Sequence, residues 1–263
     1  TPSLLAIQGP PGTGKTRALV ERLRSLCFDD GEADGRALLC APTNVGAANL
    51  YARCVAAGFG DDVALALAPD RVPLGSDVRR SDPSGSRIVC ATVSARAGPL
   101  LDGEEFEHVL VDEAAQCMEA WTWTLLRPEV RTLTLAGDVR QLPALVSETG
   151  RALRHDRSLM ERLVVGLGYA NVDRLTEQNR MAPELLAWPN ARFYGGALRC
   201  GPHAPARGEV RLVAVEGGVE ERGGGKRDKG EEGKPASGGG DAASWCNRAE
   251  AAAAAEEARR CVT

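Results

Sequence analysis

The 263-residue sequence has few aromatic residues, no basic excess and no long apolar run. Aromatic residues make up 4% of it, and the formal net charge of −4 argues against a generally basic surface. A nucleic-acid partner is compatible with this charge, because a binding groove needs only local Lys and Arg. No apolar run approaches the length of about 18 residues that a membrane span needs, and no segment has the pattern of a signal peptide. We therefore expect a soluble, intracellular protein that has no membrane partner.

The cysteines lack the spacing of a metal site. All eight are scattered, none forms a C-x-x-C pair, and several lie inside apolar runs. This disfavours zinc and predicts buried free thiols in a reducing compartment. There is no initiator methionine, and the first strand candidate begins within a few residues of Thr1, so we expect a piece of a longer chain.

The clearest motif is a phosphate loop, G-x-x-x-x-G-K-S/T, with Gly9, Gly14, Lys15 and Thr16 at its fixed positions. The apolar run Leu4–Ile7 precedes it and a helical pattern follows, which is the context that the motif needs. Such a loop turns its N–H groups toward phosphate oxygens, and the helix N-terminus adds its dipole. We predict that Lys15 reaches the β- and γ-phosphates and that Thr16 offers a hydroxyl to Mg²⁺. The predicted nucleotide site consists of Gly9, Pro10, Pro11, Gly12, Thr13, Gly14, Lys15 and Thr16.

Five apolar runs in the first half of the chain are strand candidates, and helical patterns separate most of them. They are Leu4–Gln8, Ala37–Ala41, Arg87–Thr92, His108–Asp112 and Thr132–Ala136. This alternation predicts an α/β fold with a parallel sheet that helices cover on both faces. Ligands of such sheets gather at the carboxyl ends of the strands, and polar or small residues follow each candidate there. Residues 61–86 have mixed polarity with several Pro and Gly, and we interpret them as irregular.

The second half contains weaker patterns. A helix is expected at 158–167, with Ser158 as its N-cap and Glu161 as the capping-box partner. The remaining candidates are strands at 172–176 and 209–215 and helices at 183–193 and 247–261. Residues 216–243 are rich in Gly and charged residues, which predicts a flexible, solvated insert. We place a first domain at residues 1–168 and a partial second domain at 169–263.

Polar residues at two other strand ends fit nucleotide hydrolysis. Asp112 and Glu113 end a buried strand. In P-loop proteins the first carboxylate of such a pair holds Mg²⁺, and the second can take a proton from the attacking water. An acidic pair after a strand is more often a solvated loop, but the phosphate loop upstream reverses that preference. Gln141 follows another strand, where a glutamine can hydrogen-bond the γ-phosphate or the lytic water.

Taken in order, these blocks resemble the superfamily 1B helicases of the nonsense-transcript-regulator group, which includes senataxin and the immunoglobulin-mu-binding helicase. The similar segments are residues 8–16 (motif I), 39–44 (Ia), 112–116 (II), 137–143 (III) and 175–181 (IV). Only residues 61–86 and the Gly-rich insert lack counterparts. In motif IV the family pattern is Tyr-Arg-Met-His, and here Asn179 and Ala182 flank Arg180-Met181.

The resemblance implies a RecA-like P-loop NTPase domain followed by the start of a second one. It implies that Asp112 holds Mg²⁺, that Glu113 activates water and that Gln141 senses the γ-phosphate. Arg180 would reach that phosphate from the second domain, which ties hydrolysis to closure of the cleft. The activity implied is an ATP-dependent helicase that moves along single-stranded RNA or DNA, 5′ to 3′.

The same resemblance assigns strand contacts to four residues, Pro42, Thr43, Asn44 and Thr92. Contacts of this kind grip phosphates without reading bases, which suits a translocase. Two alternatives stay open: a P-loop ATPase of another class that acts on proteins, and a catalytically weak piece that only binds nucleotide and strand. Neither RNA nor DNA is favoured by these residues, and no protein partner is indicated.

Overall fold

The computed structural model describes residues 3–28, 35–68, 71, 83–209, 213, 215, 220–222 and 245–262. They belong to two compact units, Thr1–Gly208 and Glu209–Thr263, each of which is described by itself. The strand predicted at 209–215 and the insert predicted at 216–243 lie for the most part outside the described residues.

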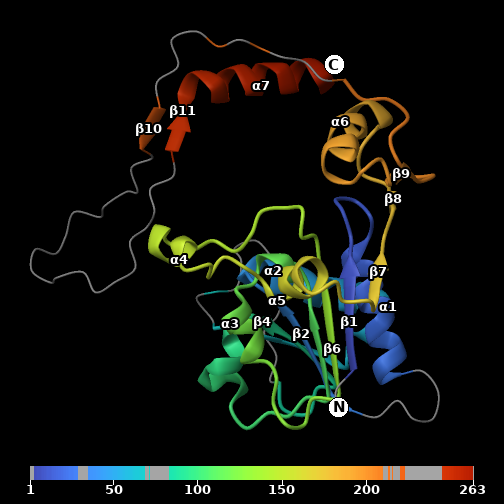
Figure 1. Cartoon of the computed structure of the whole chain (residues 1–263), viewed down its shortest axis with the longest axis vertical. Coiled ribbons are helices and arrows are strands. Elements are labelled where there is room, and N and C mark those ends of the chain that lie inside the picture. The colour runs from blue at the N-terminus through green and yellow to red at the C-terminus, as the bar shows by residue number, and fades with distance from the viewer. Residues whose placement is uncertain are drawn as a thin grey trace, which may run out of the picture. The chain divides into compact units, whose positions relative to one another are not determined.

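The first unit is built on a seven-stranded sheet in the order β3-β4-β2-β5-β6-β1-β7, in which all neighbouring strands are parallel (Figure 1). The strands are β1 (Ser3–Gln8), β2 (Ala37–Ala41), β3 (Val63–Ala66), β4 (Ile88–Thr92), β5 (His108–Val111), β6 (Thr132–Gly137) and β7 (Val172–Arg174). The predicted α/β fold with a parallel sheet is therefore confirmed. The short pair β8 (Glu177–Gln178) and β9 (Arg199–Cys200) lies apart from this sheet.

Strand β3 corrects the interpretation of residues 61–86 as irregular. Its four residues are all buried, and they pair with β4 at the edge of the sheet. A four-residue apolar run surrounded by polar residues, Pro and Gly is too short to stand out by its periodicity. At the opposite edge, β7 pairs with β1, with Ala6 opposite Val172.

Helices cover both faces of the sheet because successive residues of a strand point to opposite sides. In β2, Leu38 and Cys40 belong to one buried cluster, whereas Leu39 and Ala41 belong to another. The first unit contains α1 (Lys15–Cys27), α2 (Asn44–Cys54), α3 (Glu119–Trp123), α4 (Glu148–Ala152), α5 (Leu159–Glu161) and α6 (Pro183–Phe193). Helices α1 and α2 pack in the second cluster, and α5 packs in the first.

Shorter turns and caps define the helix boundaries. Three 3₁₀ turns span Val93–Ala97, Pro99–Leu101 and Ala114–Gln116, and wider π-type turns continue α2 (Val55–Phe59) and α5 (Arg162–Gly166). The Ser158 hydroxyl accepts the Glu161 N–H at 3.0 Å, so the predicted cap is confirmed. Pro183 opens the predicted helix α6, because the fixed φ of proline suits the first turn of a helix.

In the second unit, β10 (Glu220–Arg222) pairs antiparallel with β11 (Trp245–Asn247), and α7 (Arg248–Val262) follows. The Asn247 side chain accepts the N–H groups of Ala249 and Glu250, which caps α7. Among the described cysteines of the first unit, five are buried free thiols and Cys200 is exposed. No helix in the described part of the chain is both long and apolar enough to cross a membrane.

Candidate functional site

The loop between β1 and α1 has the backbone geometry of a phosphate cradle. Gly12 and Gly14 take φ values of 76° and 85°, the left-handed region that favours glycine. The Thr13 N–H and hydroxyl both donate to the Pro10 carbonyl, at 3.3 and 2.7 Å, and close the turn. At Gly9 an added Cβ would collide with the Lys15 side chain. The loop therefore depends on its glycines, and the open N–H groups of the first turn of α1 lie at its end.

Two consecutive carboxylates at the end of β5 face the loop in different directions. The Thr16 hydroxyl donates to Asp112 Oδ2 at 2.8 Å, and the Lys15 ammonium lies 3.7 Å from Glu113 Oε1. Glu113 has φ 50° and ψ 38°, so the chain turns sharply between the two residues. That turn aims Asp112 at Thr16 and Glu113 at Lys15, although they are neighbours in a strand end.

Arg180 reaches the loop from the segment before α6. The Asn179 N–H donates to the Gly12 carbonyl at 3.0 Å, and an added Cβ on Gly12 would meet the Arg180 side chain. Gln178 is fully buried, and its Oε1 accepts the N–H groups of Arg180 and Met181 at 2.9 and 2.7 Å. This fixed turn holds Arg180 against the phosphate loop.

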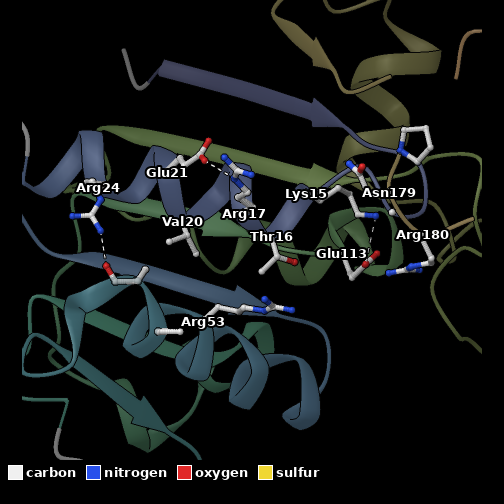
Figure 2. Close-up of a pocket in the computed structure, with 15 residues that line it drawn as sticks. Lys15, Thr16, Arg17, Val20, Glu21, Arg24, Arg53, Glu113, Asn179 and Arg180 are labelled. Atoms are coloured by element: carbon white, nitrogen blue, oxygen red, sulfur yellow. Dashed lines mark hydrogen bonds and ion pairs between the residues drawn. The ribbon is translucent and has the colours of Figure 1, made fainter. Parts of the chain in front are cut away.

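These residues line a cavity of about 760 Å³, which we call the nucleotide pocket (Figure 2). Figure 2 shows the Lys15 and Arg180 side chains directed toward the end of the pocket that Glu113 occupies. Its charged lining comprises Lys15, Arg17, Arg24, Arg53 and Arg180 against Glu21 and Glu113. Five cations and two anions give the pocket a positive field that suits a polyphosphate. Arg53, at the end of α2, was not identified from the sequence.

Gln141 lies outside the described lining of this pocket. Its amide donates to Asp138 Oδ2 at 2.9 Å, beside β6. Asp138 is 1% exposed, and Gln8 and Tyr194 also donate to it. Burial raises the pKa of the Tyr194 hydroxyl, and the hydrogen bond to Asp138 adds to this. Neither Gln8 nor Tyr194 was identified as a site residue, because their partner lies far away in the sequence.

A second cavity, of about 750 Å³, lies at the ends of β2, β4 and β5, and we call it the apolar groove. Its described lining is Pro42, Thr43, Val93, Ser94, Gln116, Cys117, Met118, Trp121, Leu142, Pro143, Ala144, Leu145 and Arg151. Leu142 and Leu145 are 80% and 94% exposed, and Trp121 is 38% exposed. Apolar side chains this open to water, gathered around one groove, are typical of a binding surface.

Two of the four predicted strand-contact residues, Pro42 and Thr43, line the apolar groove. The Thr43 hydroxyl accepts the Gly46 N–H at 3.0 Å and caps α2. Thr92 is 8% exposed and shares a hydrogen bond with Ser94, which does line the groove. Asn44 is half-buried in the first turn of α2 and outside the described lining.

Two models of a family described as "AAA domain" match the chain, one at residues 1–81 and 83–149 and the other at 155–262. "Probable helicase MAGATAMA 3" of Arabidopsis thaliana is 29% identical over 211 residues, covering 65% of this chain and 26% of that protein. "DNA-binding protein SMUBP-2" of Mesocricetus auratus is 29% identical over 260 residues, covering 74% of this chain and 26% of that protein. The chain thus spans about a quarter of the length of these relatives.

Among solved structures, the arterivirus nonstructural protein 10 helicase in complex with DNA matches with a TM-score of 0.52 at 20% identity. The match covers 82% of this chain and 46% of that one. At this identity the likeness concerns the fold, and it agrees with the parallel sheet described above.

Proposed function

We propose that this chain binds and hydrolyses ATP in the nucleotide pocket and moves along single-stranded nucleic acid. The chain belongs to the AAA-domain family and to the superfamily 1 helicases of the nonsense-transcript-regulator group. The observation that carries the proposal is the convergence of Lys15, Glu113 and Arg180 on one cationic cavity. Those three side chains come from segments far apart in sequence.

The donor set fits Mg²⁺ with a nucleotide. Mg²⁺ prefers hard oxygen ligands and is usually held by one or two carboxylates together with substrate phosphates. The Thr16 hydroxyl and the Asp112 carboxylate are already 2.8 Å apart beside the phosphate loop. When bound, the ion neutralises phosphate charge. Thr16 and Asp112 would hold the ion in place, and Lys15 and Arg180 would supply further positive charge around the γ-phosphate.

Glu113 is placed to act as the base. It lies at the mouth of the pocket, with its side chain 39% exposed, so water can reach it. Its partner in this structure is Lys15, whose ammonium is the group that a γ-phosphate would engage. A nucleotide that draws Lys15 away leaves the Glu113 carboxylate free to accept a proton from the attacking water.

The apolar groove is the proposed strand site. Thr43 lines it at a helix start, where backbone N–H groups and a hydroxyl can hold a phosphate. Trp121 and the exposed leucines offer flat or apolar surface on which bases can pack without regard to sequence. The 5′ to 3′ direction remains part of the proposal through the family resemblance.

The test is ATP hydrolysis by the chain with and without single-stranded RNA and DNA, for wild type, Glu113→Gln and Glu105→Gln. Glu105 is an exposed carboxylate before β5 and serves as the matched control. We expect strand-stimulated hydrolysis that falls by a factor of about 100 or more in Glu113→Gln, with ATP binding and the Glu105→Gln variant unchanged. Hydrolysis in Glu113→Gln equal to wild type would contradict the proposed base.

A further inference from the structure

The Asp138 carboxylate accepts hydrogen bonds from its own loop and from two distant parts of the first unit. Its Oδ1 accepts the Gln8 side chain at 2.6 Å and the Arg140 N–H at 3.0 Å. Its Oδ2 accepts the Gln141 amide at 2.9 Å and the Tyr194 hydroxyl at 2.7 Å. Gln8 is the last residue of β1, directly before the phosphate loop, and Tyr194 directly follows α6. Asp138 is 1% exposed, and donors of this kind offset the cost of burying its carboxylate.

The segment from Glu177 to Gly208 is joined to the preceding part of the first unit by three hydrogen bonds among the described residues. The Asn179 N–H donates to the Gly12 carbonyl, the Arg199 N–H donates to the Thr176 carbonyl, and the Tyr194 hydroxyl donates to Asp138. A cavity of about 290 Å³ lies beside Tyr194. The segment that carries Arg180 is therefore held by a few specific hydrogen bonds next to open space.

Gln141 and Tyr194 share one oxygen, which makes their bonds interdependent. Gln141 must leave Asp138 to reach a γ-phosphate, because its amide is engaged there, outside the described lining of the nucleotide pocket. After it leaves, Tyr194 is the remaining side-chain donor to Oδ2 among the described residues. The undivided negative charge of that oxygen then holds the hydroxyl more tightly. A tyrosine hydroxyl already carries its proton at neutral pH, and burial raises the pKa of Tyr194 further, so this hydroxyl can donate.

We infer that Asp138 and Tyr194 form a latch that tightens when Gln141 turns toward a bound nucleotide, and so holds the Arg180 segment against the phosphate loop. Both are positioning residues, because neither lines the described nucleotide pocket. The inference rests on the proposed function, since it assumes that ATP occupies this pocket. It adds a route by which nucleotide binding is communicated from the loop after β6 to the segment after α6.

Hydrogen–deuterium exchange of the whole chain tests the latch, with and without a non-hydrolysable ATP analogue and Mg²⁺. The variant is Tyr194→Phe, which removes the hydroxyl and keeps the ring. The matched control is Tyr169→Phe, because the Tyr169 hydroxyl also makes one 2.7 Å hydrogen bond, to the Leu4 carbonyl. In wild type and Tyr169→Phe we expect the analogue to slow exchange several-fold both at residues 9–16 and at residues 190–200.

In Tyr194→Phe the analogue should still protect residues 9–16, while the added protection at 190–200 is lost. Equal nucleotide-dependent protection at 190–200 in wild type and Tyr194→Phe overturns the latch. If the analogue protects wild type at residues 9–16 but not at 190–200, the latch is also overturned, and the proposed function stands. No protection anywhere in wild type overturns the nucleotide site itself, and the latch with it. Asp138→Asn, which removes the charge, should reproduce the Tyr194→Phe pattern.

Discussion

The nucleotide pocket and the apolar groove are nearly equal in volume, about 760 and 750 Å³, and both lie at strand ends of one parallel sheet. Their chemistry differs. Five basic side chains line the pocket, whereas Arg151 is the one charged residue in the described lining of the groove. The pocket is suited to a concentrated negative charge, and the groove to ring faces with a few phosphate contacts.

This contrast would allow a chain with a net charge of −4 to bind the two proposed anionic ligands. A triphosphate carries several charges in a small volume, so it needs cations packed around it. A single strand can be held through stacking and a few backbone donors, which require no basic surface. The difference leads to predictions in which each site is damaged separately.

The largest effect is expected from Lys15→Ala. Lys15 is almost buried, with a side chain 10% exposed, and its ammonium lies 3.7 Å from Glu113 Oε1 in the nucleotide pocket. Removing a desolvated charge partner should weaken ATP binding about 100-fold, as measured by calorimetry. Binding of single-stranded nucleic acid should stay within error, because Lys15 is outside the described lining of the groove.

Arg131→Ala, which removes an exposed cation at the opposite end of the sheet, is the control for Lys15→Ala. If both variants weakened ATP binding equally, the loss would come from net charge and not from the pocket. If Lys15→Ala weakened binding of the single strand as much as binding of ATP, the two cavities would not be separate sites.

A smaller effect is expected from Trp121→Ala in the apolar groove. Stacking of a base on an aromatic side chain is worth about 1–3 kcal/mol, so strand affinity should fall roughly tenfold. The slope of affinity against salt should not change, because that slope counts phosphate contacts. Fluorescence anisotropy of a labelled single strand over a salt series measures both quantities.

Trp123→Ala is the matched control for Trp121→Ala. Trp123 is 48% exposed on the same helix and bonds Glu119, but it is outside the described lining of the groove. An equal loss in both variants would assign the effect to α3 stability. A changed salt slope in Trp121→Ala would mean that the groove holds phosphates where we place bases.

The nucleotide pocket could be predicted from the sequence more fully than the groove, because its chemistry requires particular residues at fixed spacing. A phosphate loop needs glycines, Lys and Thr at fixed spacing, and Gly12 and Gly14 indeed take left-handed φ values. Six of the seven strands of the main sheet were predicted from apolar runs, whereas the four-residue β3 and the short strands β8 to β11 were not. The pair Asp112-Glu113 could be identified because two carboxylates directly follow a buried apolar run.

What the sequence did not predict depends on pairings between distant residues. Gln8 and Asp138 are 130 positions apart and bonded at 2.6 Å, and Tyr194 meets the same carboxylate from beyond α6. No local pattern distinguishes these side chains from ordinary polar residues. The role of Trp121 could not be predicted either, because a helix as short as α3 has too few turns to show in the sequence which face is exposed.

The smallest effect is expected from Thr43→Ala, which removes a group with two roles. The hydroxyl accepts the Gly46 N–H and still has its own proton to donate to a phosphate. Losing the cap should lower the free energy of unfolding by about 1 kcal/mol, measured by urea denaturation. Losing the donor should weaken strand binding only a few-fold, since one neutral hydrogen bond contributes about 1 kcal/mol.

Ser147→Ala is the control, because it removes the equivalent cap of α4. The Ser147 hydroxyl accepts the Gly150 N–H at 3.1 Å and is outside the described lining of the groove. Ser147→Ala should therefore lower the free energy of unfolding without changing the affinity for the single strand. Thr43→Ser should preserve both quantities. A loss of affinity in Ser147→Ala as large as in Thr43→Ala would reduce Thr43 to a structural cap and leave Trp121 as the main contact in the groove.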